Sequence, residues 1–183
     1  VRQVFDGDDQ GRLIGTRHHA PDGKVLLDVA FAYDALSRPV SRTARDAHGW
    51  VTEAVCYDEL GRLASTTWTY EAGGTAGRRK LVLAWRVDNK LIGKRWYGDD
   101  DRWLRDETMD YDTRGRLMDH RILADAIDEF PIDEAGQAYR QQCFVYDWLD
   151  NLSSVTTTRC DGQVNVTTYA YDDIDRDRLV SVS

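Results

Sequence analysis

The sequence contains few of the residues that build disulfide scaffolds and helix surfaces. Its 183 residues include only 3 Cys, 3 Pro, 4 Lys and 6 Glu. The three cysteines, Cys56, Cys143 and Cys160, are odd in number and far apart, so they form neither a disulfide framework nor a CxxC zinc pair. We expect them to be small buried residues in strands. The scarcity of Lys and Glu, which commonly fill exposed helix faces, argues against a helical bundle.

The sequence also has no long apolar run and no excess of positive charge. No segment approaches the roughly 18 apolar residues that cross a bilayer, and the first residues show no targeting signal. The net charge is −8, whereas nucleic acids and anionic membranes are bound by clustered cations. We therefore expect no nucleic-acid partner and no membrane span.

The abundant residues are those of strands and turns. There are 26 Asp, 20 Arg, 9 Tyr and 6 Trp. Asp favours turns because its short carboxylate bonds nearby backbone amides, and aromatic residues favour strands. This composition indicates strands joined by many turns.

One phrase recurs along the chain: an aromatic residue, Asp, two variable residues, then Gly-Arg-Leu or a remnant of it. The two best copies begin at Tyr57-Asp58, with Gly61 and Arg62, and at Tyr111-Asp112, with Gly115 and Arg116. Looser copies begin at Phe5-Asp6, Tyr33-Asp34, Val87-Asp88, Tyr146-Asp147 and Tyr171-Asp172. The starts are 24 to 35 residues apart, which is the mark of one supersecondary unit repeated with variable loops. We expect 1–183 to be a single region of six to seven repeats.

A second turn signal lies between the copies. It occurs as Asp22-Gly23, Asp46 to Gly49, Asp133 to Gly136 and Asp161-Gly162. In such turns Asp accepts from turn amides and Gly takes a positive φ. Segments such as 51–57 and 164–171 alternate with the period of a strand and carry apolar residues on both faces. The predicted fold is all-β, an antiparallel meander of hairpins in a curved strip, with a loop or one helical turn within 124–142.

The tyrosine-aspartate phrase with Gly-Arg-Leu resembles the YD repeat of the RHS (rearrangement hotspot) family. That family includes bacterial polymorphic toxins, insecticidal toxin complexes and animal teneurins. The resemblance covers nearly the whole chain, from Phe5 to Leu179. It implies a piece of the wall of a hollow β-shell that encloses a toxin domain, in a secreted or delivered bacterial toxin component.

The same resemblance implies the partners of this chain. They are further repeats of the same polypeptide or a partner shell subunit, together with the enclosed toxin domain. Self-cleaving members of the family carry an Asp-Pro-x-Gly-Leu motif near the end of the shell, and Pro21, Pro39 and Pro131 do not lie in such a setting. Autoproteolysis is therefore not carried over to this chain.

Candidate sites outside the repeat are weak. The Asp6–Gly11 stretch resembles the start of a calcium loop, but Arg17 replaces the carboxylate at the twelfth position, so we expect an ordinary repeat turn. We expect Asp99-Asp100-Asp101 to be a solvated turn. The histidines lack zinc spacing, and we expect surface or loop positions for His18, His19, His48 and His120. No serine lies in a GxSxG elbow, so we expect no enzyme activity and no cofactor or metal.

Two alternatives to the wall function remain. The chain could be an extracellular adhesion or carbohydrate-binding module, in which tryptophans stack on sugars, or an enzyme whose site no motif reveals. The terminal segments Val1–Phe5 and Leu179–Ser183 both resemble strands, and the second lacks the Lys or Pro that blunts a sheet edge. We expect edge-to-edge self-association or a place within a larger polypeptide.

Overall fold

The computed structural model describes all residues from Val1 to Ser183, with about 62% of them in strands and 3% in helix. The predicted all-β antiparallel meander is confirmed. The chain divides into two units, one comprising 1–83 with 96–102 and the other 84–95 with 103–183. No helix is long and apolar enough to cross a membrane.

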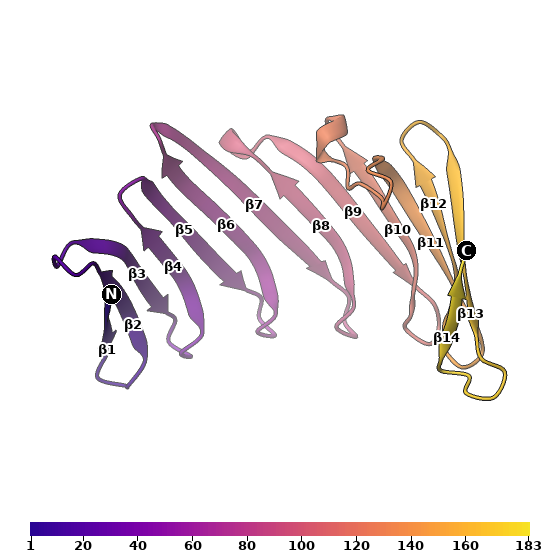
Figure 1. Cartoon of the computed structure of the whole chain (residues 1–183), viewed down its shortest axis with the longest axis horizontal. Coiled ribbons are helices and arrows are strands. Elements are labelled where there is room, and N and C mark those ends of the chain that lie inside the picture. The colour runs from indigo at the N-terminus through magenta and orange to yellow at the C-terminus, as the bar shows by residue number, and fades with distance from the viewer. The chain divides into compact units, whose positions relative to one another are not determined.

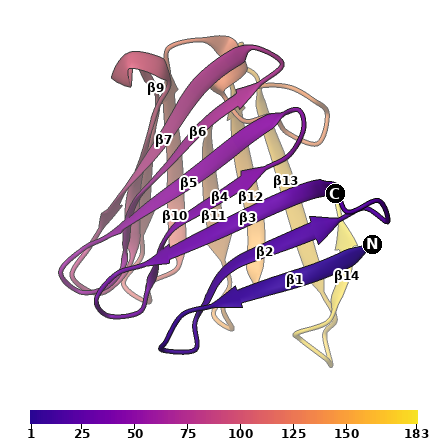
Figure 2. The same cartoon turned by 90° about the vertical axis from the view of Figure 1, so that its left-hand side faces the viewer.

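The first unit is built of hairpins in chain order. Its strands are β1 (Arg2–Gly7), β2 (Leu13–His19), β3 (Val25–Tyr33), β4 (Pro39–Arg45), β5 (Gly49–Tyr57), β6 (Leu63–Ala72) and most of β7 (Thr75–Trp85). Each of these strands pairs antiparallel with the next one in the sequence. Figure 2 places β1, β2 and β3 at the front, where their side-by-side arrangement is plain. The unit also holds the end of β8 (Leu91–Tyr97) and a short 3₁₀ turn, η1 (Asp99–Asp101).

The second unit repeats the same plan. Its strands are the first part of β8, then β9 (Trp103–Tyr111), β10 (Leu117–Ala124), β11 (Tyr139–Tyr146), β12 (Leu152–Arg159), β13 (Val164–Tyr171) and β14 (Leu179–Val182). From β9 to β14 the pairing follows the order of the chain (Figure 1). The segment expected to be a loop or one helical turn contains the 3₁₀ helix η2 (Ile127–Glu129) and a hairpin between Ile132 and Ala138.

Apolar burial is small for a chain of this length. The buried hydrophobic residues are Leu104, Met109, Ile122 and Val155, all in the second unit. Large apolar side chains such as Val87, Leu36 and Ile174 are mostly exposed. Because only these four apolar side chains are buried, backbone pairing and the turns that set its register must supply much of the stability of each unit.

A bulge accompanies most of the repeated turns. In the β5–β6 hairpin Cys56 pairs with Ser65 but Tyr57 pairs with Leu63, so Ala64 is the extra residue. The same shift precedes Gly7, Tyr33, Tyr146 and Tyr171. Bulges change the direction of neighbouring side chains. Here each bulge lies at the last strand residue before the turn, which is a tyrosine in every case except Gly7.

The terminal segments form strands, as expected, in β1 and in the four-residue β14. Edge-to-edge self-association stays a prediction.

Candidate functional site: the tyrosine-aspartate turn

Each repeated turn is organised around its aspartate, and the turn after Tyr57 shows the arrangement. One oxygen of Asp58, Oδ1, accepts hydrogen bonds from the backbone amides of Leu60 and Arg62, both at 2.9 Å. The other oxygen, Oδ2, accepts from Nε of Arg62 at 2.7 Å. The amide of Gly61 donates to the Asp58 carbonyl, and Gly61 has a φ of 79°. The aspartate therefore caps the turn, and the glycine takes the positive φ that the turn requires.

Other turns repeat this geometry closely. In the second of the two best copies Gly115 has a φ of 80°. The aspartate-to-arginine bond recurs in Asp8–Arg12 at 2.6 Å, Asp34–Arg38 at 2.7 Å and Asp112–Arg116 at 2.6 Å. Each of these arginines pairs with the aspartate of its own turn.

The arginine of one turn also contacts the tyrosine of the next. The guanidinium of Arg12 lies 4.9 Å from the ring centre of Tyr33, and that of Arg38 lies 4.3 Å from the ring centre of Tyr57. In the second unit Arg116 lies 4.7 Å from the Tyr146 ring. Cation–π contacts of this kind are attractive when the cation is within about 6 Å of the ring centre.

A tyrosine hydroxyl adds a second contact between turns at Tyr33, Tyr57, Tyr111 and Tyr171. Tyr33 donates to the carbonyl of Leu13 and Tyr57 to the carbonyl of Pro39, both at 2.8 Å. In the second unit Tyr111 and Tyr171 donate in the same way to Leu91 and Leu152. Each accepting residue directly follows the arginine position of the preceding turn. We call these contacts between successive turns, the arginine against the ring and the hydroxyl on the carbonyl, the turn ladder. Tyr33 and Tyr57 make both contacts, whereas Tyr146 makes the arginine contact and Tyr171 the hydroxyl bond.

The register of two degenerate copies differs from the prediction. In the first copy the turn aspartate is Asp8, not Asp6, because the amides of Gln10 and Arg12 donate to Asp8, and Gly7 occupies the aromatic position. Asp6 instead pairs with Arg17 on the neighbouring strand.

The copy expected at Val87-Asp88 begins two residues earlier. The Arg86 amide donates to the Lys90 carbonyl, as Asp58 does to Arg62, so Trp85 stands in the tyrosine position and Arg86 in the aspartate position. Arg86 then pairs with Asp88 inside the turn at 2.7 Å. The backbone turn therefore survives replacement of its aspartate by a residue of opposite charge.

Three copies place a residue other than glycine in the left-handed position. Ser37, Asn89 and Asp150 have φ values of 61°, 65° and 72°. Asn and Asp tolerate this conformation better than most residues. Asp150 also accepts from Arg116 at 2.7 Å and from Arg114 at 2.8 Å, so the preceding turn binds it.

An additional turn of the same type lies in the segment between β10 and β11. The amides of Ala135 and Gln137 donate to Oδ1 of Asp133, and Gly136 has a φ of 74°. Its arginine comes from elsewhere, since Nε of Arg159 donates to Oδ2 of Asp133 at 2.7 Å. Asp133–Gly136 was predicted to be one of the turns that lie between the repeat copies. Its spacing, Ile-Asp-x-x-Gly-Gln-Ala, in fact matches the repeat itself.

The second set of turns is confirmed with one exception. Gly23, Gly136 and Gly162 have positive φ, whereas Gly49 does not. At Gly49 a Cβ would collide with the backbone carbonyl of Glu71, so this glycine is needed for close approach of two strands.

The turn aspartates are held in their charged form. The backbone amide of Arg38 and then the Arg38 side chain lower the pKa of Asp34, and Arg116 does the same to Asp112. At Asp58, burial opposes the shift, but the hydrogen bonds from Arg62 and Leu60 lower the pKa overall. The pKa of Asp88 is lowered to about 2, chiefly by its bonds from Arg86. These carboxylates are acceptors in the turn rather than proton donors for catalysis.

A buried ionic cluster lies on β8, β9 and β10 of the second unit, and sequence reasoning missed it. Glu107 is 7% exposed and contacts Arg105 and His120 at 3.0 Å and Lys94 at 3.5 Å. Burial alone would raise the pKa of Glu107, but the His120 hydrogen bond and the charges of Lys94 and Arg105 lower it to about 2. The expectation that His120 lies on the surface or in a loop is wrong, because its side chain is largely covered within β10.

The remaining candidates are placed as follows. Cys56 is exposed and Cys160 lies in a turn, so the expectation of buried strand cysteines fails for both. Asp99 and Asp101 lie in the η1 turn and both bond Arg78. Trp68 and Trp96 stack on each other with ring centres 6.1 Å apart. Trp148, in contrast, is 68% exposed.

No family model matches the chain, and no curated protein matches it. The chain is similar to parts of two solved structures. In the crystal structure of TcdB2-TccC3-TEV it aligns over 98% of its own length, with 13% identity and a TM-score of 0.35. In a porin-like protein from Bacteroides uniformis it aligns over 80%, with 15% identity and a TM-score of 0.34. The chain spans 11% of the length of the first and 51% of the second.

Proposed function

We propose that this chain is a segment of the wall of an encapsulating β-shell of the RHS (YD-repeat) type, in a secreted or delivered bacterial toxin component. Its partners would be further repeats of the same polypeptide or of a partner subunit, and the enclosed toxin domain. Its role is architectural, and the proposal assigns no catalytic residue and no cofactor.

The observation that best supports this function is the turn ladder. Arg12, Arg38 and Arg116 each bind the aspartate of their own turn and lie against the tyrosine ring of the next. Such nearest-neighbour contacts can be added repeat by repeat without a central core. A wall needs this property because its length must grow while its thickness stays that of one sheet.

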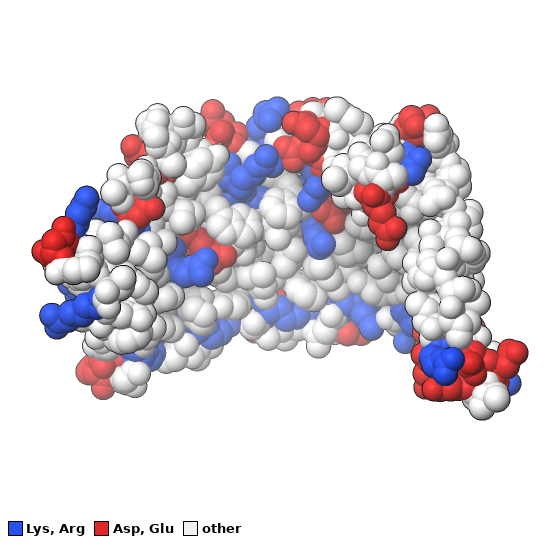
Figure 3. All heavy atoms as spheres, viewed as in Figure 1, with Lys and Arg blue, Asp and Glu red and all other residues white.

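The distribution of apolar and charged side chains supports the same function. Only four hydrophobic residues are buried, while many large apolar residues remain exposed along the strands. On the face in Figure 3, Lys and Arg side chains and Asp and Glu side chains lie in scattered groups among residues of other types. A mixed polar surface with scattered apolar residues can border an enclosed chain without holding it in one fixed pose.

The proposal can be tested on the protein produced from the complete coding sequence that contains these residues. Electron microscopy should reveal a hollow particle with this segment in its wall, and limited proteolysis should leave an enclosed domain uncut. The double variant Arg38→Ala, Tyr57→Ala should open the wall to protease, whereas Tyr70→Phe, outside the ladder, should not. A solid particle, or equal cleavage of all three proteins, would contradict the wall function.

A further inference from the structure

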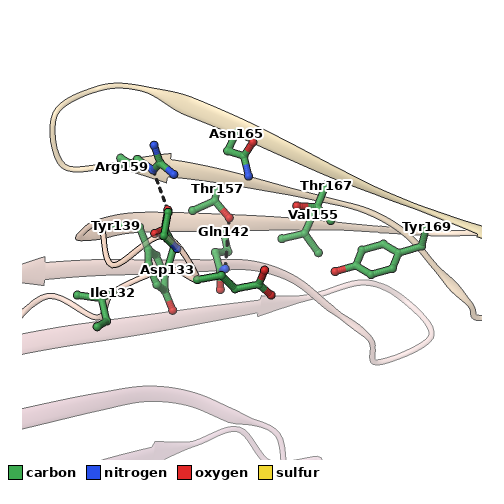
Figure 4. Close-up of a pocket in the computed structure, with 12 residues that line it drawn as sticks. Ile132, Asp133, Tyr139, Gln142, Val155, Thr157, Arg159, Asn165, Thr167 and Tyr169 are labelled. Carbon is green, nitrogen blue, oxygen red and sulfur yellow. Dashed lines mark hydrogen bonds and ion pairs between the residues drawn. The ribbon is translucent and has the colours of Figure 1, made fainter. Parts of the chain in front are cut away.

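A polar pocket lies in the second unit between the Asp133 turn and the strands β11, β12 and β13. Its volume is about 350 Å³, at the lower end of the range for small-molecule sites. Figure 4 shows side chains from all three strands pointing into the same space, with the loop residues Ile132 and Asp133 at one end and Tyr169 at the other. The pocket lies away from the repeated turns that form the ladder.

Away from the Asp133 turn, the strand residues that line the pocket are uncharged, and most of them are polar. Val155 and Thr157 are 8% and 7% exposed and form the buried part of the lining. The amides of Gln142 and Asn165 supply both donors and acceptors, and Gln142 donates to the Thr157 hydroxyl at 3.3 Å. The Tyr169 side chain points toward Val155 and Thr167 with its hydroxyl end foremost, and its ring forms one end of the pocket (Figure 4). Amides, hydroxyls and a tyrosine ring together suit a ligand with several hydroxyl groups on a compact saturated ring.

The charges at the rim oppose binding of an anion. Arg159 is the cation of the lining, and its Nε bonds Oδ2 of Asp133 at 2.7 Å, with both side chains largely covered. Glu134 adds a further negative charge beside this pair. A phosphate or carboxylate would therefore have to compete with Asp133 for Arg159 and approach Glu134. The geometry favours a neutral ligand.

We propose that this pocket binds one neutral sugar ring, either a free monosaccharide or the terminal unit of a glycan. Gln142 and Asn165 would exchange hydrogen bonds with the sugar hydroxyls, and the Tyr169 ring would cover its apolar face. This binding site goes beyond the wall function and does not depend on it, since no residue of the turn ladder takes part.

The test uses the 183-residue chain and a panel of free neutral hexoses and N-acetylhexosamines, with glucuronate as the charged analogue. Titrations followed by NMR should show saturable binding of at least one neutral sugar with a Kd on the order of 1 mM, as expected for so small a ligand. The side-chain amide signals of Gln142 and Asn165 should shift. A second titration uses disaccharides that end in the same sugar. If the pocket takes the terminal unit of a glycan, these disaccharides bind as well; if it takes only the free monosaccharide, they do not.

Two variants alter the pocket, and a third variant is the matched control. Asn165→Ala removes a polar wall and Thr167→Trp fills the space, so each should weaken binding by about tenfold or more. Val166→Ala lies between them on the same strand but faces the other side of the sheet, and should bind as the unmodified chain does. Thermal melts of all three variants establish that they are folded.

Three outcomes would overturn the proposal. The first is no binding of any neutral sugar by the folded chain. The second is binding that Asn165→Ala and Thr167→Trp leave unchanged, which would place the sugar elsewhere. The third is tighter binding of glucuronate than of its neutral parent sugar, because the rim charges would then attract the anion. All three outcomes leave the wall function untouched.

Discussion

Arg38 and Tyr57 belong to different turns, yet the guanidinium of Arg38 lies 4.3 Å from the ring centre of Tyr57. The same guanidinium is fixed by Asp34 of its own turn through a 2.7 Å bond. The Tyr57 hydroxyl in turn donates to the carbonyl of Pro39, the residue after Arg38. The two residues thus join one hairpin to the next, and their contact should contribute to stability as a pair.

We expect a double-mutant cycle of Arg38→Ala and Tyr57→Ala to reveal this pairing. At a partly exposed site the coupling free energy should be about 0.5–1 kcal/mol, measured from urea unfolding of the four proteins. Tyr57→Phe keeps the ring and removes only the hydrogen bond to Pro39, so it should cost about 1 kcal/mol. Tyr70→Phe is the matched control outside the ladder and should change stability little. Additive single substitutions would show that the ladder contact does not couple the turns.

Gly115 is expected to resist substitution because of its backbone conformation. Its φ of 80° strains any residue with a Cβ, whereas Nζ of Lys90, 2.8 Å from that Cβ, is the end of a flexible side chain and can move aside. Gly115→Ala should therefore destabilise the chain by on the order of 1 kcal/mol or more. Gly136, with a φ of 74° and open space around it, reports the backbone strain alone. If Gly115→Ala costs no more than Gly136→Ala, the Lys90 contact has no energetic weight, and a neutral Gly115→Ala would contradict the turn geometry.

The positions of the strands and of the best turns could be predicted because their chemistry is local. Asp58 accepts hydrogen bonds from the backbone amides of Leu60 and Arg62, which lie within four residues of it in the phrase Tyr-Asp-x-x-Gly-Arg. The register of the degenerate copies could not be predicted in this way. Two hydrogen bonds of each turn run between backbone groups and do not depend on the side chains, so the turn persists where Gly7 replaces tyrosine or Arg86 replaces aspartate.

Contacts between residues far apart in the sequence were beyond prediction. Arg159 completes the Asp133 turn from 26 residues away. Glu107 and His120 meet because β9 and β10 pair in one register, and a shift of one residue would move them to opposite faces. Nothing in the local sequence around either residue marks it as part of a buried cluster.

Acid is expected to weaken the turns in a defined pH range. The hydrogen bonds from Arg38 and Arg116 lower the folded-state pKa of Asp34 and Asp112 below the value of about 3.9 in the unfolded chain. A lowered folded pKa means that the unfolded chain binds protons first. The stabilisation is therefore complete above pH ~4 and is lost as the pH falls through the folded pKa.

Unfolding midpoints measured between pH 7 and pH 2 check this expectation. They should change little down to pH ~5 and fall below pH ~4, where the unfolded-state aspartates take up protons. Asp34→Asn should reduce the fall, whereas Asp9→Asn, at an exposed position beside a turn aspartate, should leave it unchanged. An unfolding midpoint that rises as the pH falls would mean that folding does not stabilise the charged form of these carboxylates.

Glu107 is expected to be the most sensitive ionic residue of the second unit. It is 7% exposed and faces three basic side chains, Arg105, Lys94 and His120. Glu107→Gln keeps the shape but removes the negative charge, so Arg105 and Lys94 repel each other in a partly dehydrated site. Removing one partner of a buried ion pair typically lowers the free energy of unfolding by about 3–5 kcal/mol. Because Lys94 is partly exposed, we expect a loss near the lower end of that range.

A comparison with Glu53 separates burial from charge. Glu53 is 30% exposed and lies 3.8 Å from Arg42, so Glu53→Gln should cost less than about 1 kcal/mol. Urea unfolding of the two variants beside the unmodified chain gives both losses directly. His120→Gln, which can still donate to Glu107, should be milder than Glu107→Gln because the carboxylate keeps Arg105 and Lys94 as partners. Equal small losses at Glu107 and Glu53 would mean that water reaches the cluster and that its charges are screened as they are at the surface.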